Sequence, residues 1–470
     1  MVINRALSVG NHGNCDVDGD GDVDAIDVQL AIKGALGIGN DGDLVANPNP
    51  NLGEQKTIVI LLSFEDDGIS DSDYVSNSNH IVFDYLDRYI KEISYNKAWI
   101  SGNIVGPYKI SNTGCWQSGP WQDNHGILLE KAIQAADNDV NFKNYNRIII
   151  FNKDYDFCPA SAQGSIGIID ESSSYYALMN SNEGKITASV LWFNPDLGIN
   201  VDNNQVLIHE FGHNLGLSHV DGLKCYDNSN RITISDNCQT IPGLGSVFSD
   251  PMASAGRDAH FNAYNKKIIG WLTNQNIITT NNGDYLLEPL ELSSNGIKLI
   301  QIPIPYLPYQ YFLEFRIPTG FDEYDPLGYP LDGVFLYSNQ PGSKNTFSLD
   351  LPPFPNPDNF DFGPLTVGTY VDSDIGLSVT INSISENGAD ISITTTSSIT
   401  QCSDGINNDG YSDTYVDDAD FSCLINGVYD SNQISEYEPM AECQDKLDND
   451  FDGNIDLYDS DCDDTQDNTE

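Results

Sequence analysis

One stretch of the chain, from His209 to His219, restricts its possible structure more than any other. His209 and His213 lie four residues apart, so an α-helix would present both imidazole rings on the same face. Gly216 can adopt a positive φ and end that helix, which would let the chain turn back. The turn would bring His219 toward the first two histidines. We therefore predict a helix, a turn and three converging imidazole rings.

Three imidazole ligands with one open position are typical of a catalytic zinc site, whereas structural zinc sites usually have four protein ligands. Glu210 directly follows the first histidine, so its carboxylate would stand beside the ion as the general base for a water molecule. Two histidines and a glutamate also occur together by chance on buried helices. The complete spacing favours one Zn²⁺ held by His209, His213 and His219, with Glu210 as the catalytic residue.

This stretch resembles the signature of the metzincin metallopeptidases, in which a methionine turn follows the third histidine. Met252 is placed to be the turn methionine, and residues 260–272 are similar to the segment that closes the catalytic domain in gametolysin-like peptidases. The resemblance extends in weaker form over residues 57–275. It implies a zinc endopeptidase that acts on protein or peptide substrates.

The same resemblance makes the strand at residues 186–194 the edge strand above the substrate cleft. An exposed edge can accept an extended peptide as an additional strand. The expected substrate-strand residues are Trp192, Phe193 and Asn194, although ordinary core packing would equally explain the two aromatic residues. Some metzincins carry a tyrosine ligand two residues after the turn methionine. Ser254 occupies that position here, so no such ligand is expected.

The pattern of apolar runs predicts a multidomain chain. Strand-like runs alternate with helical stretches in residues 57–275, which indicates an α/β or α+β catalytic domain with a mixed, twisted sheet covered by helices. We expect strands at 57–64, 94–108, 147–152 and 186–194, with helices at 81–93 and 127–136. Residues 276–398 contain short apolar runs separated by turn residues and predict an all-β sandwich.

The net charge of −49, from 70 acidic and 21 basic residues, argues against nucleic acid and anionic membranes as partners. The sequence also lacks an apolar stretch of about 20 residues that could span a membrane. Many of the acidic residues lie in short loops. We therefore expect two or more structural Ca²⁺ ions.

The N-terminal domain, residues 1–45, contains a candidate calcium loop with a glycine at its sixth position. Its carboxylate ligands would be Asp16, Asp18, Asp20, Asp22, Asp24 and Asp27. The loop and the helix after it resemble one half of a dockerin, so a cohesin-like docking partner is one interpretation. A small calcium-stabilised spacer is the other. Residues 46–56 are rich in asparagine and proline and read as a linker.

The C-terminal region, residues 399–470, contains two related acidic units. The second has the spacing of a calcium loop, with ligands Asp448, Asp450, Asp452, Asn454, Asp456 and Asp459. The first matches the calcium-loop pattern less well, and a solvated acidic tail is the alternative interpretation. The cysteine pairs Cys402/Cys423 and Cys443/Cys462 bracket the two units, which favours compact calcium-binding repeats.

Local cysteine pairs indicate an oxidising compartment. Besides the C-terminal pairs, Cys225 lies close to Cys238 in the sequence, and Cys115 can pair with Cys158. Cys15 is left over and is a candidate thiol ligand of a latent zinc site, as in related peptidases.

The first residues lack the apolar core of a signal peptide. We nevertheless predict a secreted, extracellular protein. The alternative function is a calcium-stabilised adhesin or complex component whose metal site is not catalytic.

Overall fold

The computed structural model describes most of the middle of the chain. The described residues are 50–63, 71–110, 121–152, 162–170, 173, 175–193, 205–227, 230–232, 238–241, 250–253, 258–304, 310–323, 332–339, 346–349, 364–372, 375–395, 401–403, 420–425 and 428–431. Both predicted calcium loops, Cys15, Cys115, Cys158, Cys443, Cys462, Asn194 and Ser254 lie outside them. The chain divides into two units, Met1–Gly53 and Glu54–Glu470. The elements below belong to the second, apart from the first residue of β1.

A five-stranded sheet forms the first layer of this unit. Its strand order is β2-β1-β3-β7-β4, and the pairs β1–β3 and β3–β7 are parallel. Continuous apolar runs such as Ile58 to Leu62 are fully buried, as expected for strands that are covered on both faces. The strands are β1 (Gly53–Ser63), β2 (Ala98–Lys109), β3 (Arg147–Asn152), β4 (Ala162–Gly164) and β7 (Ser189–Phe193).

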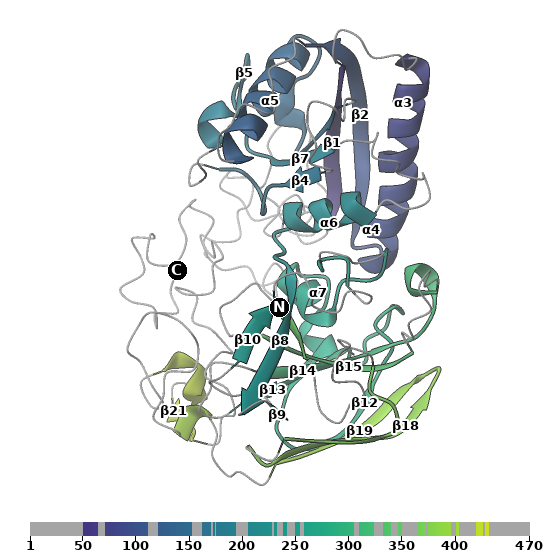
Figure 1. Ribbon diagram of the computed structural model, residues 1–470, viewed down its shortest axis with the longest axis vertical. Coiled ribbons are helices and arrows are strands. Elements are labelled where there is room, and N and C mark those ends of the chain that lie inside the picture. The colour runs from purple at the N-terminus through teal and green to yellow at the C-terminus, as the bar shows by residue number, and fades with distance from the viewer. Residues whose placement is uncertain are drawn as a thin grey trace, which may run out of the picture. The chain divides into compact units, whose positions relative to one another are not determined.

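Helices cover this sheet on its two sides (Figure 1). Helix α5 (Trp121–Ala136) packs its apolar residues against alternate residues of β1 and β3, such as Ile58 and Ile148. The helical stretch predicted from residue 81 begins earlier, and consists of α3 (Asp71–Asn79), the π-helical turn η1 (His80–Leu86) and α4 (Asp87–Ile93). Short elements in the same region are η2 (Phe142–Asn144), η3 (Tyr176–Leu178), β5 (Asn180–Ser181) and β6 (Gly184–Lys185).

The predicted edge strand is not at the edge of the sheet. β7 lies between β3 and β4, so that Trp192 pairs with Ile150 on one side and with Gln163 on the other. Trp192 and Phe193, on opposite faces of the sheet, are both buried, as expected for a strand that is covered on both faces. Among the described residues, β4 is the last strand beyond β7, and it runs antiparallel to it. The prediction was wrong because the apolar run of β7 marks a central strand, whereas the short sequence of β4 has no apolar pattern.

Two further sheets pack face to face in the described residues. An eight-stranded sheet has the order β10-β8-β16-β15-β14-β13-β11, with β9 paired to β8, and a four-stranded sheet has the order β12-β19-β18-β17. One apolar core contains residues of both sheets, including Leu313 and Leu336 from the larger sheet and Val379 and Ile391 from the smaller. The strands are β8 (Val220–Asp227), β9 (Asn230–Ile232), β10 (Cys238–Ile241), β11 (Ile277–Thr279), β12 (Gly283–Leu287), β13 (Leu299–Pro303), β14 (Gln310–Arg316), β15 (Gly333–Asn339), β16 (Thr346–Leu349), β17 (Gly368–Asp372), β18 (Leu377–Ser385) and β19 (Gly388–Thr395).

The larger sheet crosses the domain boundary that the sequence suggests at residue 275. Strands β8 to β10, from the segment just after the histidine motif, join strands from residues 277–349. β8 pairs in parallel with β16, placing Val220 opposite Thr346. The mixed α/β character of the fold agrees with the prediction, and sheets predominate. The same part of the chain also contains α7 (Ala263–Ile268) and the short helices η4 (Asn274–Asn276) and η5 (Gly320–Asp322).

Two disulfides are present in the described part of the chain. Cys225 is bonded to Cys238 across the β8–β10 pair, and Cys402 is bonded to Cys423. Both pairs were predicted, and they are consistent with an oxidising setting. Short elements surround the second bond: η6 (Gln401–Ser403), η8 (Phe421–Cys423), β20 (Leu424–Ile425) and β21 (Val428–Tyr429). None of the described helices has both the length and the hydrophobicity needed to cross a membrane.

Candidate metal centre

Helix α6 (Gln205–Asn214) carries the first two histidines of the motif. Leu207, Ile208 and Phe211 are buried and anchor the helix in the fold. Gly216 has a φ of 94°, and its N–H donates to the carbonyl of His213 at 2.8 Å. This left-handed residue ends the helix, as the sequence predicts. Glycine suits the position because a residue with a side chain rarely adopts such a φ.

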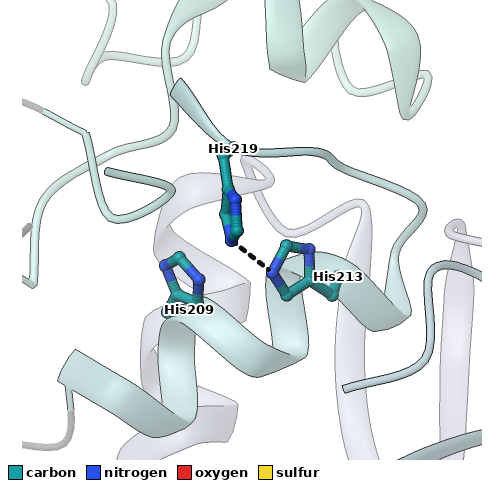
Figure 2. Close-up of side chains that lie close together, drawn as sticks. All are labelled: His209, His213 and His219. Atoms are coloured by element: carbon teal, nitrogen blue, oxygen red, sulfur yellow. Dashed lines mark hydrogen bonds between the residues drawn. The ribbon is translucent and has the colours of Figure 1, made fainter. Parts of the chain in front are cut away.

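The turn brings all three imidazole rings together (Figure 2). His209 and His213 point from α6 toward the ring of His219, which immediately precedes β8. One ring nitrogen of each histidine lies within 4.8 Å of the others, and the Nε2 atoms of His213 and His219 are 3.2 Å apart. In the described residues, this is the one group of three or more histidine, cysteine or acidic side chains that could hold a metal ion.

The hydrogen bonds of the rings determine which nitrogen is open for a ligand. His209 donates from Nδ1 to the carbonyl of Pro251 at 2.8 Å, and His213 donates from Nδ1 to the carbonyl of Leu217 at 2.8 Å. A carbonyl oxygen can only accept, so each Nδ1 carries the proton and each Nε2 keeps a lone pair. Carbonyl partners of this kind orient the histidine ligands of metal sites.

Burial favours the neutral form of these rings. It lowers the pKa of His213 to about 4, against the hydrogen bond to Leu217, which raises it. The pKa of His209 is also lowered by burial. A group of three imidazole rings matches the ligand set of a zinc ion with one open position. His209, His213 and His219 therefore fit the ion that the sequence predicts, and they would hold it through nitrogen.

Glu210 lies against the short strand β4. Its Oε2 accepts a hydrogen bond of 2.6 Å from the backbone N–H of Gly164. Burial raises the pKa of Glu210 to about 7, while this hydrogen bond acts in the opposite direction. A carboxyl group with a pKa near neutrality is suited to accept and return a proton. Gly164 is required for this contact because a Cβ there would collide with the backbone carbonyl of Glu210.

Met252, the predicted turn methionine, packs against α6. It is fully buried, and its sulfur lies so close to Gly212 that a Cβ at that position would overlap it. Its carbonyl accepts a hydrogen bond of 3.0 Å from the N–H of Val220, the residue after His219. The preceding residue, Pro251, supplies the carbonyl that orients His209. The turn around Met252 therefore contacts both ends of the histidine motif.

Asp250 holds this turn and was not predicted from the sequence. Its carboxylate accepts hydrogen bonds of 2.8 Å from the N–H of Met252 and 2.8 Å from the N–H of Asn262. The side chain is fully buried, and burial raises its pKa to about 6. An aspartate two residues before the methionine is a signal for such a turn, since its side chain can bond to the backbone two residues on. Nothing in the local sequence predicts the hydrogen bond between Asp250 and the N–H of Asn262.

Arg147 and Asn214 were also missed. The buried guanidinium of Arg147, in β3, donates to the carbonyl of Asn214 at 2.8 Å, at the C-terminal end of α6. A cation is favourable at this end of a helix. The Asn214 amide donates to the carbonyls of Ser165 at 3.1 Å and Val190 at 2.9 Å. Together these contacts fix the end of α6 against β3, β7 and the chain that leaves β4.

Comparison of the sequence with protein families and curated proteins identified no relative. The inference about function therefore depends on the residues of the site. Of the site residues predicted from the sequence, the structure brings together the three histidines and Met252, and it places Glu210 on the same helix. Trp192 and Phe193 are buried in the sheet.

Proposed function

We propose that the protein is a zinc-dependent endopeptidase of the metzincin type. The observation that carries the proposal is the convergence of three imidazole rings, whose candidate ligand nitrogens all lie within 4.8 Å of one another. Three protein nitrogens leave one coordination position for water or substrate, which distinguishes this set from a closed structural site.

The bound ion would act as a Lewis acid for a water molecule and a peptide carbonyl. Glu210 would accept the proton of the attacking water and deliver it to the leaving amine, because burial holds its pKa near 7. Pro251 and Leu217 would keep the rings of His209 and His213 in the correct tautomer.

We propose that the substrate strand is β4 and the residues after it. β4 is the last strand of its sheet among the described residues, and its Gly164 contacts Glu210. An extended peptide can add to such an edge through backbone hydrogen bonds. Ile166, which is 59% exposed just beyond β4, would offer an apolar contact to a substrate side chain.

The two disulfides support action in a secreted setting, whereas the calcium loops stay a prediction.

The test is the variant Glu210→Gln, which keeps the size of the side chain but cannot act as a base. We expect it to retain zinc and to lose casein hydrolysis by about 10²–10⁴-fold, the usual contribution of a general base. The control is Glu130→Gln, on the exposed face of α5, which should cleave at the wild-type rate. A Glu210→Gln variant with wild-type activity would contradict the proposal, as would wild-type activity that survives removal of zinc by a chelator.

A further inference from the structure

We propose that Thr346, in strand β16 of the larger sandwich sheet, is a positioning residue for the metal ligands at both ends of the histidine motif. The proposal deepens the function proposed above and rests on the zinc site. Thr346 lies 127 positions after the last ligand. It would act through two separate connections, one to His219 and one to His209.

The first connection is the strand pairing that follows His219. The next residue, Val220, begins β8, and β8 pairs in parallel with β16. Val220 lies directly opposite Thr346 in this register. Strand β8 is an interior strand of the sheet, between β10 and β16. The position of the third ligand is therefore set by a strand that β16 holds in place.

The second connection is a series of buried hydrogen bonds that leads to His209. The Thr346 hydroxyl accepts a bond of 3.1 Å from the side-chain amide of Asn262. The N–H of Asn262 donates to Asp250 at 2.8 Å, and the other carboxylate oxygen of Asp250 accepts from the N–H of Met252 at 2.8 Å. Within this turn, the carbonyl of Pro251 accepts from His209. Thr346, Asn262 and Asp250 are all fully buried, so water cannot replace a lost bond.

Asn262 is the branch point of this series. Its side-chain oxygen caps α7 by accepting from the N–H of Asn265 at 2.8 Å, and its amide nitrogen bonds to Thr346. Loss of the Thr346 hydroxyl would leave that amide nitrogen without this acceptor in a buried place. Asn262 would have to shift, and Asp250 with it, which would change the carbonyl that orients His209. Residues that orient metal ligands typically contribute 10–100-fold to metal affinity.

The test compares Thr346→Val, which removes the hydroxyl at constant shape, with Thr346→Ser, which retains it. We expect Thr346→Val to bind Zn²⁺ at least about 10-fold more weakly than wild type, and the visible spectrum of its Co²⁺ form to change. Thr346→Ser should restore most of the affinity and the wild-type spectrum. The matched control is Thr280→Val, because the buried hydroxyl of Thr280 also makes a bond, of 2.8 Å to the carbonyl of Asn282, away from the histidines.

Three results would overturn the proposal. They are wild-type zinc affinity in Thr346→Val, an equal loss of affinity in Thr280→Val, and no recovery in Thr346→Ser. If Thr346→Val does not fold, hydrogen exchange of the wild-type protein decides instead. Zinc should then slow exchange in residues 346–349 as well as in α6, and protection confined to α6 would refute the connection. A wild-type protein that binds zinc but cleaves no protein would contradict the proposed function and leave this test intact.

Discussion

Two clusters of side chains in this protein use the imidazole ring differently: the triad is exposed at His219, whereas the single His260 of the second cluster is fully buried. In the triad, His209 and His213 each donate a hydrogen bond from one ring nitrogen to a backbone carbonyl. The other ring nitrogen points toward the centre of the triad. In the second cluster, His260 has a partner on both nitrogens: Nδ1 contacts the side-chain nitrogen of Lys266 at 2.9 Å, and Nε2 contacts Glu92 at 3.3 Å.

The difference shows how a metal ligand can be told from a structural histidine. Burial lowers the pKa of both His213 and His260, which favours the neutral ring in each case. Neutrality alone therefore does not identify a ligand. The two clusters differ in the partners of the ring nitrogens. In the triad, one nitrogen of each ring is directed at the other rings, whereas both nitrogens of His260 contact the side chains of Lys266 and Glu92. The second cluster connects α4 and α7, because Glu92 and Lys266 contact the two nitrogens of the same ring.

The largest effect should come from removing one histidine of each cluster. We expect His219→Ala to lose bound zinc and to lower hydrolysis by several orders of magnitude, because two imidazoles cannot complete the site. His260→Ala should keep one zinc per chain but unfold at a lower temperature, because Glu92 and Lys266 would lose a buried partner. Metal content after dialysis and thermal unfolding would separate the two variants. Tight zinc binding by His219→Ala, or loss of zinc from His260→Ala, would contradict the assignment of the triad as the metal site and of His260 as a structural residue.

A smaller effect is expected from the ion pairs next to the second cluster. Arg316 is fully buried and donates to Glu314 at 2.6 Å and to Asp322 at 3.3 Å. Arg316→Met would leave two buried carboxylates without this cation and should lower the free energy of unfolding by about 3–5 kcal/mol. The exposed pair between Lys91 and Asp87 serves as the control, and Lys91→Met should cost about 0.5 kcal/mol or less. Urea unfolding would measure both, and equal losses would show that burial is not the cause.

The smallest effect concerns pH. Burial lowers the pKa of Lys266 to about 7, whereas an unfolded lysine has its ordinary value of 10.5. Between these values the unfolded chain holds a proton that the folded chain has released, so the fold becomes more stable as the pH rises. Between pH 8 and 9 this group should add about 1 kcal/mol to the free energy of unfolding. Urea unfolding of Lys266→Met should lack this increment, and an identical pH dependence in wild type and variant would refute the assignment.

The sequence by itself determined the elements that depend on local spacing. The interval between His209 and His213 specifies one helix face, and Gly216 specifies the turn that returns His219. Apolar runs identified the buried strands, and short separations identified the pairs Cys225–Cys238 and Cys402–Cys423. These features were predictable because the residues that produce them are close together in the chain.

The tertiary structure decided which strands became neighbours, and local pattern contains little of that information. It placed β4 beyond β7, although the three residues of β4 carry no apolar alternation. It joined β8 to β16, so that the residue after the third ligand lies opposite Thr346. It also buried Asp250, Asn262 and Thr346 in one hydrogen-bonded series. Such contacts depend on how separate segments of the chain pack, because a buried polar group takes whatever partner the folded chain brings to it.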